Sequence, residues 1–490
     1  MTRSLPHTNS KPHVHLSSPV RSPRQSHHPN PPTRPISDTS VITTSLQPSS
    51  TMAPSKPHPP ISTTLPPLLL GTATFNHQYV SDPLSMPYRD IVSRAISLGV
   101  KAFDTSPYYG PSEVLLGTAL DSLMNPTASA SNPLPIPLER ESIFLVTKAG
   151  RIAGDEFDYS PTWIKYSILR SLQRLHTEYL DLVYMHDVEF VSPDEVLTAV
   201  KELRKLRDEE GLVRYVGISG FPADVLASLA EMILDKTGEP LDAVLSYGHF
   251  TVQNRKLALP WVTGETSPEE SSSSPLARLK RAGVEVVLNA SMLGMGLLTN
   301  RGIPPDERSE ASPLAKWHPS PPELRVACKD LSDITATAGE RLESVAIRWS
   351  LQEWARIGAA AGVGVQVPSA ASGSNTAKVG ATVCGVSSIS ELEETVAEWK
   401  GVLSSLGHVV EGRTDPAYGK ERQNKVVQLV EKKLWPALGS WVDYAWDSPG
   451  PGYVNTRREE DQGRIPSDSI MIAYQQRKAA RLAVDAEPKK

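Results

Sequence analysis

The stretch YLDLVYMHDVEFVSPDEVLTAVKELRKLRDEEGLVRYVGIS, residues 179–219, contains the pattern that decides the fold. It opens with a short apolar run, Tyr179–His186, continues as an amphipathic segment, Pro193–Glu210, and closes with a second apolar run, Val213–Ser219. Short apolar runs are typical of buried strands, whereas the spacing in the middle segment indicates a helix. Proline after Ser192 fits the first turn of that helix. The stretch therefore predicts two strands joined by a helix.

The same alternation extends over most of the chain. Buried strands are predicted at Leu68–Ala73, Val100–Asp104, Ile143–Lys148, Tyr179–His186, Val213–Ser219, Leu241–Ser246, Val284–Ala290 and Ala381–Val386. Helical periodicity follows at Arg89–Gly99, Pro161–Leu175, Pro193–Glu210, Pro222–Leu234 and Ile389–Leu403. Strands that alternate with helices form a parallel sheet with both faces covered, either open and doubly wound or closed. Eight repeats favour an α/β fold of the (β/α)8 type, a TIM barrel.

The barrel is expected to span residues 61–410, with a different kind of sequence on each side. Residues 1–60 are rich in Pro, Ser, Thr and His, which predicts a disordered tail. Residues 411–455 are rich in Trp and are expected to pack on the barrel, and residues 456–490 to form a mobile charged tail. Within the barrel, the polar insertion Thr263–Pro275 predicts a surface loop, and the Gly-rich insertion Gly358–Gly380 a flexible excursion.

The N-terminal residues lack the apolar core of a secretory signal. Their arginines leave a mitochondrial transit peptide open, although the prolines argue against an amphipathic helix, and Met52 offers a second start for translation. We therefore expect a cytoplasmic protein, with a mitochondrial location as the alternative.

Composition narrows the classes of partner. The formal net charge of -5 gives no basic surface for nucleic acid. No apolar run is long enough to cross a membrane. The two cysteines, Cys328 and Cys384, match no metal-ligand or redox spacing, so we expect two buried thiols and no metal site.

Four polar residues lie at or just after three consecutive predicted strands. Asp104 ends the second strand and Tyr109 follows it, Lys148 ends the third strand, and His186 ends the fourth. In a barrel these positions share one rim. A lysine beside a tyrosine favours the phenolate, an aspartate keeps the lysine charged, and a neutral histidine orients a substrate oxygen. Each residue alone has a structural explanation, but the set predicts proton transfer coupled to hydride transfer.

These residues carry a resemblance to a known family. The run Asp104-Thr105-Ser106 with Tyr109-Gly110 and Ser112-Glu113, followed by Lys148 and His186, is similar to the signature of the aldo-keto reductases. The resemblance spans about residues 68–406 and implies a TIM barrel, a nicotinamide cofactor, and a catalytic tetrad of Asp104, Tyr109, Lys148 and His186. Within the family it points to NAD-linked sugar dehydrogenases that oxidise D-arabinose or L-galactose at C1.

The resemblance also implies a set of cofactor contacts at the strand ends. These candidates are Gly71, Thr72, Ser219, Ser246, Ser291, Leu293, Gly294, Gly296, Ser387 and Ser388. Two positions depart from the better-known aldehyde reductases, because Ala290 replaces an aromatic residue and Gly220 replaces an asparagine.

The segment after the last strand bears on the choice of cofactor. A ribose 2′-phosphate is bound by Lys or Arg. Residues 384–394 contain three glutamates and no positive charge, which favours NAD, although Lys378 in the neighbouring insertion leaves NADP open.

The sequence therefore predicts an NAD-dependent enzyme that oxidises an aldose at C1 to the aldonolactone, with Tyr109 as general acid and base. Its expected partner is a small sugar, and its expected state is a monomer or weak dimer. Two alternatives stay open: an NADPH-dependent reductase of aldehydes or ketones, or an enzyme acting on pyridoxal, and a regulatory subunit that senses the cofactor.

Overall fold

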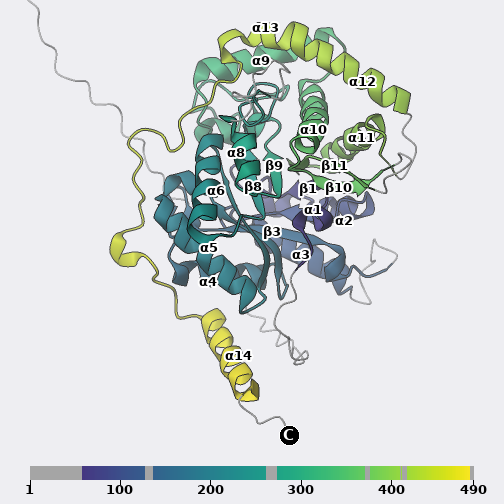
Figure 1. Ribbon diagram of the computed structural model, residues 1–490. Helices are drawn as coiled ribbons and strands as arrows, with labels where there is room; N and C mark the ends of the chain where they lie inside the picture. Colours follow the sequence, from purple (N-terminus) through teal and green to yellow (C-terminus); the bar gives the residue numbers. More distant parts are fainter. Residues whose placement is uncertain are drawn as a thin grey trace, which may run out of the picture. The chain divides into compact units, whose positions relative to one another are not determined.

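The computed structural model describes residues 58–126, 136–260, 273–369, 376–408, 410 and 416–485. Its core is a closed barrel of parallel strands in the order β1-β12-β9-β8-β7-β6-β3-β2 (Figure 1). The strands are β1 (Leu68–Gly71), β2 (Ala102–Asp104), β3 (Phe144–Ala149), β6 (Leu180–His186), β7 (Val213–Gly220), β8 (Ala243–Tyr247), β9 (Val286–Ala290) and β12 (Ala381–Gly385). All eight lie within two residues of their predicted bounds, so the predicted TIM barrel is confirmed. The predicted disordered tail at residues 1–60 falls almost wholly outside the described residues.

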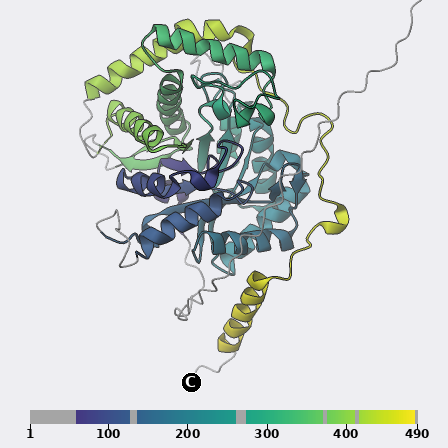
Figure 2. The ribbon, with the colours of Figure 1, turned by 180° about the vertical axis from the view of Figure 1, so that it is seen from behind.

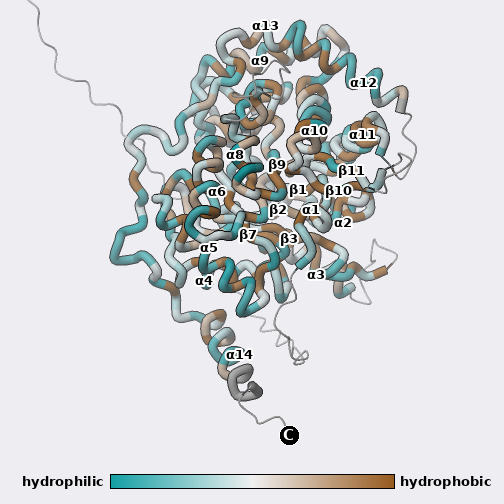
Figure 3. Tube along the Cα trace, viewed as in Figure 1, coloured by the Kyte–Doolittle hydropathy of each residue, from teal (hydrophilic) through white to brown (hydrophobic). Residues whose placement is uncertain are grey.

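Helices cover the outside of the barrel (Figures 1 and 2). They are α2 (Tyr88–Ser97), α3 (Ser112–Met124), α4 (Pro161–Arg174), α5 (Pro193–Asp208), α6 (Ala223–Thr237), α8 (Pro275–Arg281), α9 (Pro322–Thr337), α10 (Leu342–Ala360) and α11 (Ile389–Ser405). Their traces mix hydrophobic and hydrophilic residues, as expected for helices with one buried face (Figure 3). The predicted start of α5 is correct, since Ser192 forms a capping box with Glu195. The start of α6 is one residue later than predicted, because Pro222 precedes the helix as its N-cap.

The Gly-rich insertion is more ordered than predicted. Residues 358–360 of the insertion form the end of α10. Further on, β10 (Val365–Pro368) pairs antiparallel with β11 (Thr376–Val379). This hairpin immediately precedes β12 and contacts the short helix α1 (Ile61–Thr64), which leads into β1. The prediction of a flexible excursion is therefore wrong for the described part, because Val365 and Val379 are buried and pair with each other. Most of the other insertion, residues 261–272, lies outside the described residues.

The C-terminal extension first forms a helical segment on the barrel. It consists of α12 (Pro416–Leu429), a π-helical turn (Val430–Leu434), α13 (Trp435–Leu438) and a 3-10 turn (Gly439–Trp441). The indole of Trp435 donates to the Val252 carbonyl at 2.9 Å, and its ring meets Trp349 edge-on at 5.9 Å. The extension then continues as an irregular strap, residues 442–463, and ends in α14 (Ser469–Asp485).

Ion pairs and hydrogen bonds connect the strap and α14 to the barrel. Arg457 pairs with Asp158 at 3.2 Å, and the Tyr474 hydroxyl lies 2.9 Å from Glu210. The sequence predicted a mobile charged tail from residue 456 and did not anticipate this helix or these contacts. One of the charges that suggested mobility, Arg457, pairs with the barrel, whereas Arg458 and Arg464 pair with Asp461 within the extension.

A glycine in α3 provides a test of how closely the outer helices pack. A Cβ added at Gly117 would lie 1.9 Å from the Arg174 carbonyl oxygen, which is backbone and cannot rotate away. We expect Gly117→Ala to reduce the free energy of unfolding by about 2–3 kcal/mol, the upper range for overpacking. Urea denaturation of the purified variant measures this.

Gly154→Ala is the matched control, because nothing lies within 4 Å of its added Cβ. Equal urea midpoints for Gly117→Ala and Gly154→Ala would show that α3 and α4 do not pack this tightly.

Candidate active site

The four predicted tetrad residues meet at one end of three adjacent strands. Asp104 is the last residue of β2, Lys148 lies near the end of β3, and His186 is the last residue of β6. Tyr109 lies in the loop after β2. Strands β2, β3 and β6 are neighbours in the barrel, so the carboxyl ends of these strands bring the four side chains together.

Lys148 and Asp104 form a buried ion pair. The Lys148 ammonium lies 2.6 Å from Asp104 Oδ1 and also donates to the Thr105 carbonyl at 3.0 Å. Their side chains are only 2% and 6% exposed. Burial raises the pKa of Asp104, whereas the charge of Lys148 and its hydrogen bond lower it. A charge buried this deeply is tolerated when its partner is in place.

Tyr109 lies against this pair and against His186. The Lys148 ammonium is 4.9 Å from the centre of the Tyr109 ring, and the His186 ring meets it edge-on at 5.7 Å. Burial, together with the charges of Asp104 and Asp187, raises the pKa of Tyr109 well above its ordinary value. The sequence predicted that Lys148 would favour the phenolate. In the folded protein, desolvation dominates, and Tyr109 holds its proton at neutral pH.

His186 is neutral and fixed from two sides. Its Nδ1 lies 3.0 Å from the Ser106 hydroxyl, and the Tyr159 hydroxyl donates to its backbone carbonyl at 2.5 Å. Burial lowers the pKa of His186 to about 3. With Nδ1 engaged by Ser106, the other ring nitrogen of this neutral imidazole, Nε2, lies 3.6 Å from Asp187 Oδ2.

The fold adds a residue that the sequence analysis missed, Arg151. Its guanidinium bonds Asp187 Oδ2 at 2.5 Å and lies 4.0 Å from the centre of the Tyr108 ring. Asp187 is next to His186 in the sequence, and Arg151 occupies one of its carboxylate oxygens. The only sequence signal for Arg151 is its place shortly after the strand that ends with Lys148.

Comparison with known proteins assigns the chain to a family. The model of the aldo/keto reductase family matches residues 67–406. The chain belongs to the aldo/keto reductase family. It is 39% identical to D-arabinose 1-dehydrogenase of Saccharomyces cerevisiae over 290 residues, 59% of this chain and 76% of that protein. It is 32% identical to L-galactose dehydrogenase of Arabidopsis thaliana over 351 residues, 71% of this chain and 86% of that protein.

Among solved structures, the aldo-keto reductase AKR11C1 from Bacillus halodurans in its holo form aligns with a TM-score of 0.43 and 20% identity. The alignment covers 74% of this chain and 91% of that chain. The family match and the two dehydrogenase relatives show that the protein is an oxidoreductase of the aldo-keto reductase family, whose members generally use nicotinamide cofactors. Within the described residues, no helix is both long and apolar enough to cross a membrane.

The aldo-keto reductase barrel places the predicted cofactor residues around the same rim. Gly71 ends β1 and Thr72 follows it, Ser219 lies on β7, Ser246 on β8, and Ser291, Leu293, Gly294 and Gly296 follow β9. The Ser246 hydroxyl is buried and has no hydrogen-bond partner among the described residues, so the nicotinamide amide is a suitable ligand. The Thr72 hydroxyl, by contrast, already lies 2.6 Å from the Ser112 hydroxyl.

The start of α11 is occupied by a carboxylate of the chain itself. Ser388 caps the helix, and Glu391 accepts from the Ser387 amide at 2.7 Å and from its hydroxyl at 3.0 Å. The fold also brings Arg94 and Arg341 to this helix, where they pair with Glu393 and Glu394. Lys378 precedes β12, whereas Ser387 follows it, so the two lie toward opposite ends of that strand.

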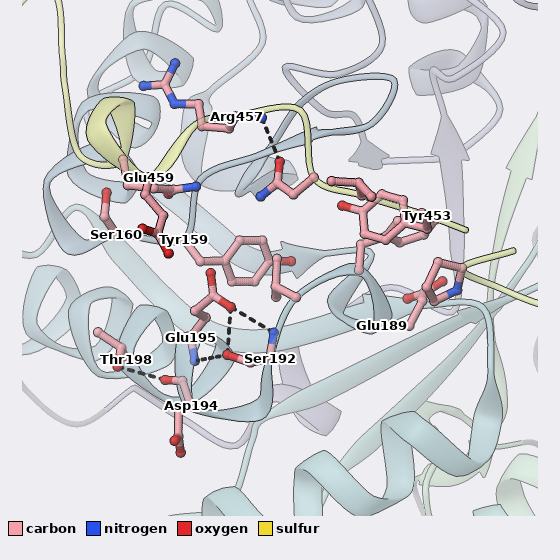
Figure 4. Close-up of a pocket in the computed structure, with 16 residues that line it drawn as sticks. Tyr159, Ser160, Glu189, Ser192, Asp194, Glu195, Thr198, Tyr453, Arg457 and Glu459 are labelled. Carbon is pink, nitrogen blue, oxygen red and sulfur yellow. Dashed lines mark hydrogen bonds between the residues drawn. The ribbon is translucent and has the colours of Figure 1, made fainter. Parts of the chain in front are cut away.

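The strap adds a wall to the rim of the barrel. The Trp446 ring stacks on Phe221 at 4.8 Å, and the Ser448 hydroxyl donates to Glu189 at 2.9 Å. A cavity of about 700 Å³ lies between the strap and the loop after β6, with Tyr453, Arg457 and Glu189 among its lining residues (Figure 4). Burial and the charge of Asp187 raise the pKa of Glu189 to about 8, so this carboxyl is protonated at neutral pH.

Buried neutral histidines give a prediction for acid stability. The pKa of His186 lies near 3 in the folded protein but near 6.5 in the unfolded chain, so the unfolded chain binds an extra proton between these values. Stability should fall as pH drops below 6.5, by up to about 1.4 kcal/mol per pH unit for each such group. His186→Gln should flatten this dependence, measured as urea midpoints from pH 7 to about 4.

The exposed His77→Gln is the matched control and should keep the wild-type slope. An unchanged slope in His186→Gln would mean that His186 is not held neutral by burial.

Proposed function

We propose that this aldo-keto reductase oxidises an aldose at C1 to the aldonolactone, with NAD as cofactor and Tyr109 as general acid and base. The observation that carries the proposal is the buried group of Tyr109, Lys148 and His186 at the carboxyl ends of adjacent strands. The sugar substrate is supported by the names of the two relatives, D-arabinose 1-dehydrogenase and L-galactose dehydrogenase.

In the proposed reaction the anomeric hydroxyl of the sugar contacts His186 Nε2 and the phenolate oxygen of deprotonated Tyr109. Tyr109 takes the hydroxyl proton while C1 loses a hydride, so the C1–O bond gains double-bond character and the ring becomes a lactone. The bound oxidised nicotinamide supplies the acceptor for that hydride. Lys148 stabilises the phenolate, and Asp104 keeps Lys148 charged.

NAD is the proposed cofactor because of the charges at α11. Glu391 occupies the donors of Ser387, and the two arginines nearby are already paired with glutamates. A further phosphate would meet carboxylates rather than free cations there. Ser387 and Ser388 remain proposed contacts for a ribose hydroxyl or the pyrophosphate.

One observation favours the alternative of an aldehyde or ketone reductase. The raised pKa of Tyr109 keeps its proton at neutral pH, and reduction of a carbonyl needs a proton donor at this position. The same residue serves both directions, so the substrate and the nucleotide decide between the two functions.

The deciding assay follows reduced-nicotinamide absorbance with D-arabinose, L-galactose and L-fucose, first with NAD and then with NADP. We expect sugar-dependent NADH formation that increases with pH, because oxidation needs the Tyr109 phenolate. Tyr109→Phe should reduce kcat at least about 100-fold while nucleotide affinity stays within about twofold.

Turnover of aldehydes with NADPH and none of any aldose would replace the proposal with the reductase. Nucleotide binding without turnover of either class would point to a regulatory subunit.

The carboxylate at α11 gives a separate test of cofactor choice. Glu391→Gln removes the negative charge nearest to Ser387, so NADP affinity should increase about tenfold relative to NAD. Direct binding measurements with both nucleotides give this ratio, and Glu353→Gln on α10 is a matched control. An unchanged ratio would place the 2′-hydroxyl away from Glu391.

A further inference from the structure

A second buried ion pair stands beside the tetrad. Arg151 lies just beyond β3, and Asp187 lies just beyond β6. Their side chains are 2.5 Å apart and only 15% and 3% exposed. This pair is separate from Lys148 and Asp104, and the proposed reaction assigns it no part.

Aromatic rings fix the Arg151 guanidinium in place. It lies 4.0 Å from the centre of the Tyr108 ring and 5.3 Å from both Phe157 and Phe190. It also donates to the Gly154 carbonyl at 2.8 Å. A planar cation held by stacking and a fork of hydrogen bonds loses little further freedom when it acts.

Asp187 shows that the chain accepts strain to form this pair. Its backbone has φ 56°, the left-handed region that costs a residue with a side chain. The carboxylate oxygen that meets Arg151 also lies 3.6 Å from His186 Nε2. The other oxygen is buried and has no hydrogen-bond partner among the described residues, so Arg151 is the cation that directly balances this charge.

The pair is linked to the reacting side chains through the Tyr108 ring. The Tyr108 ring, on which Arg151 stacks, is 6.1 Å from the Tyr109 ring and 5.7 Å from the His186 ring. The titratable groups around Tyr109 come from every neighbouring element: Tyr79, Asp104, Tyr108, Lys148, Arg151, His186, Asp187 and Tyr247. Both ion pairs therefore act on Tyr109, and each contributes one cation and one anion.

We propose that Arg151 and Asp187 are positioning residues that balance the charge around Tyr109 and hold His186 for proton transfer. The proposal rests on the proposed role of Tyr109 as acid and base but not on the sugar as substrate. Each member of the pair affects Tyr109 in the opposite sense. Without Arg151, the unbalanced carboxylate opposes the phenolate; without the Asp187 charge, the unbalanced guanidinium favours it.

The test compares Arg151→Met, Asp187→Asn and the double variant by the pH profile of kcat/KM in the oxidative direction. The pH at the midpoint of the rising limb of this profile should increase by about one unit in Arg151→Met and decrease by about one unit in Asp187→Asn. It should return close to the wild-type position in the double variant. Arg151→Lys should keep the limb in place while kcat falls, because the charge remains but the planar fork is lost.

Arg457→Met is the matched control. Arg457 is 14% exposed, pairs with Asp158 at 3.2 Å and lies 4.7 Å from the Trp163 ring, so it resembles Arg151 but is not among the groups around Tyr109. This variant should leave the limb unmoved. Thermal unfolding of every variant establishes that it is folded.

A second readout needs no substrate. The phenolate absorbance of each protein, minus that of its Tyr109→Phe version, is titrated in the presence of oxidised nucleotide and reports Tyr109 directly. Shifts of the Tyr109 titration in the two expected directions support the proposal even if no aldose is turned over. The absence of aldose turnover would contradict only the proposed function. The proposal would be overturned if the variants lost activity without a shift of the Tyr109 titration, or if Arg151→Met and Asp187→Asn shifted it in the same direction.

Discussion

The Lys148–Asp104 ion pair makes the site depend on the register of the barrel. Both charges are removed from water, at 2% and 6% side-chain exposure, and each is tolerable only beside the other. They meet because β2 and β3 pair with Asp104 opposite Val146, two residues before Lys148 and on the same face. A slip of one residue would turn Lys148 to the other face and leave two buried charges unpaired. The correct register therefore builds the barrel and the site together.

Periodicity and strand order explain how much of this could be predicted. The strands and the tetrad are local features, since Asp104, Lys148 and His186 stand at the ends of apolar runs and Tyr109 follows one. Only the closure of the barrel was needed to bring them together. The Arg151–Asp187 pair is different, because Arg151 lies beyond the end of β3 and nothing in the sequence beside it indicates that Asp187 is its partner. The raised pKa of Tyr109 could not be predicted from the sequence either, because desolvation depends on all the groups that pack around the ring.

Composition misled where a partner lay far away in the chain. Glycine and alanine suggested a flexible excursion at Gly358–Gly380, yet Val365 and Val379 pair and are buried. In the predicted charged tail, Arg457 pairs with Asp158, a contact that the charges alone did not indicate. The strap lies beyond residues 67–406, the part that the family model matches. The barrel that the family model matches thus carries the predicted tetrad, while the extension beyond that match contributes to the surroundings of the rim.

The balance of charge around Tyr109 bears on the direction of the reaction. Lys148 with Asp104 and Arg151 with Asp187 add two positive and two negative charges, so neither form of the tyrosine is fixed by net charge alone. Burial then leaves the proton on Tyr109, as reduction requires. An oxidised nicotinamide carries one positive charge that the reduced form lacks, and one added cation in a buried, balanced site favours the phenolate that oxidation requires. The same four charged side chains therefore suit both directions, and in the proposed enzyme the redox state of the bound cofactor selects the role of Tyr109.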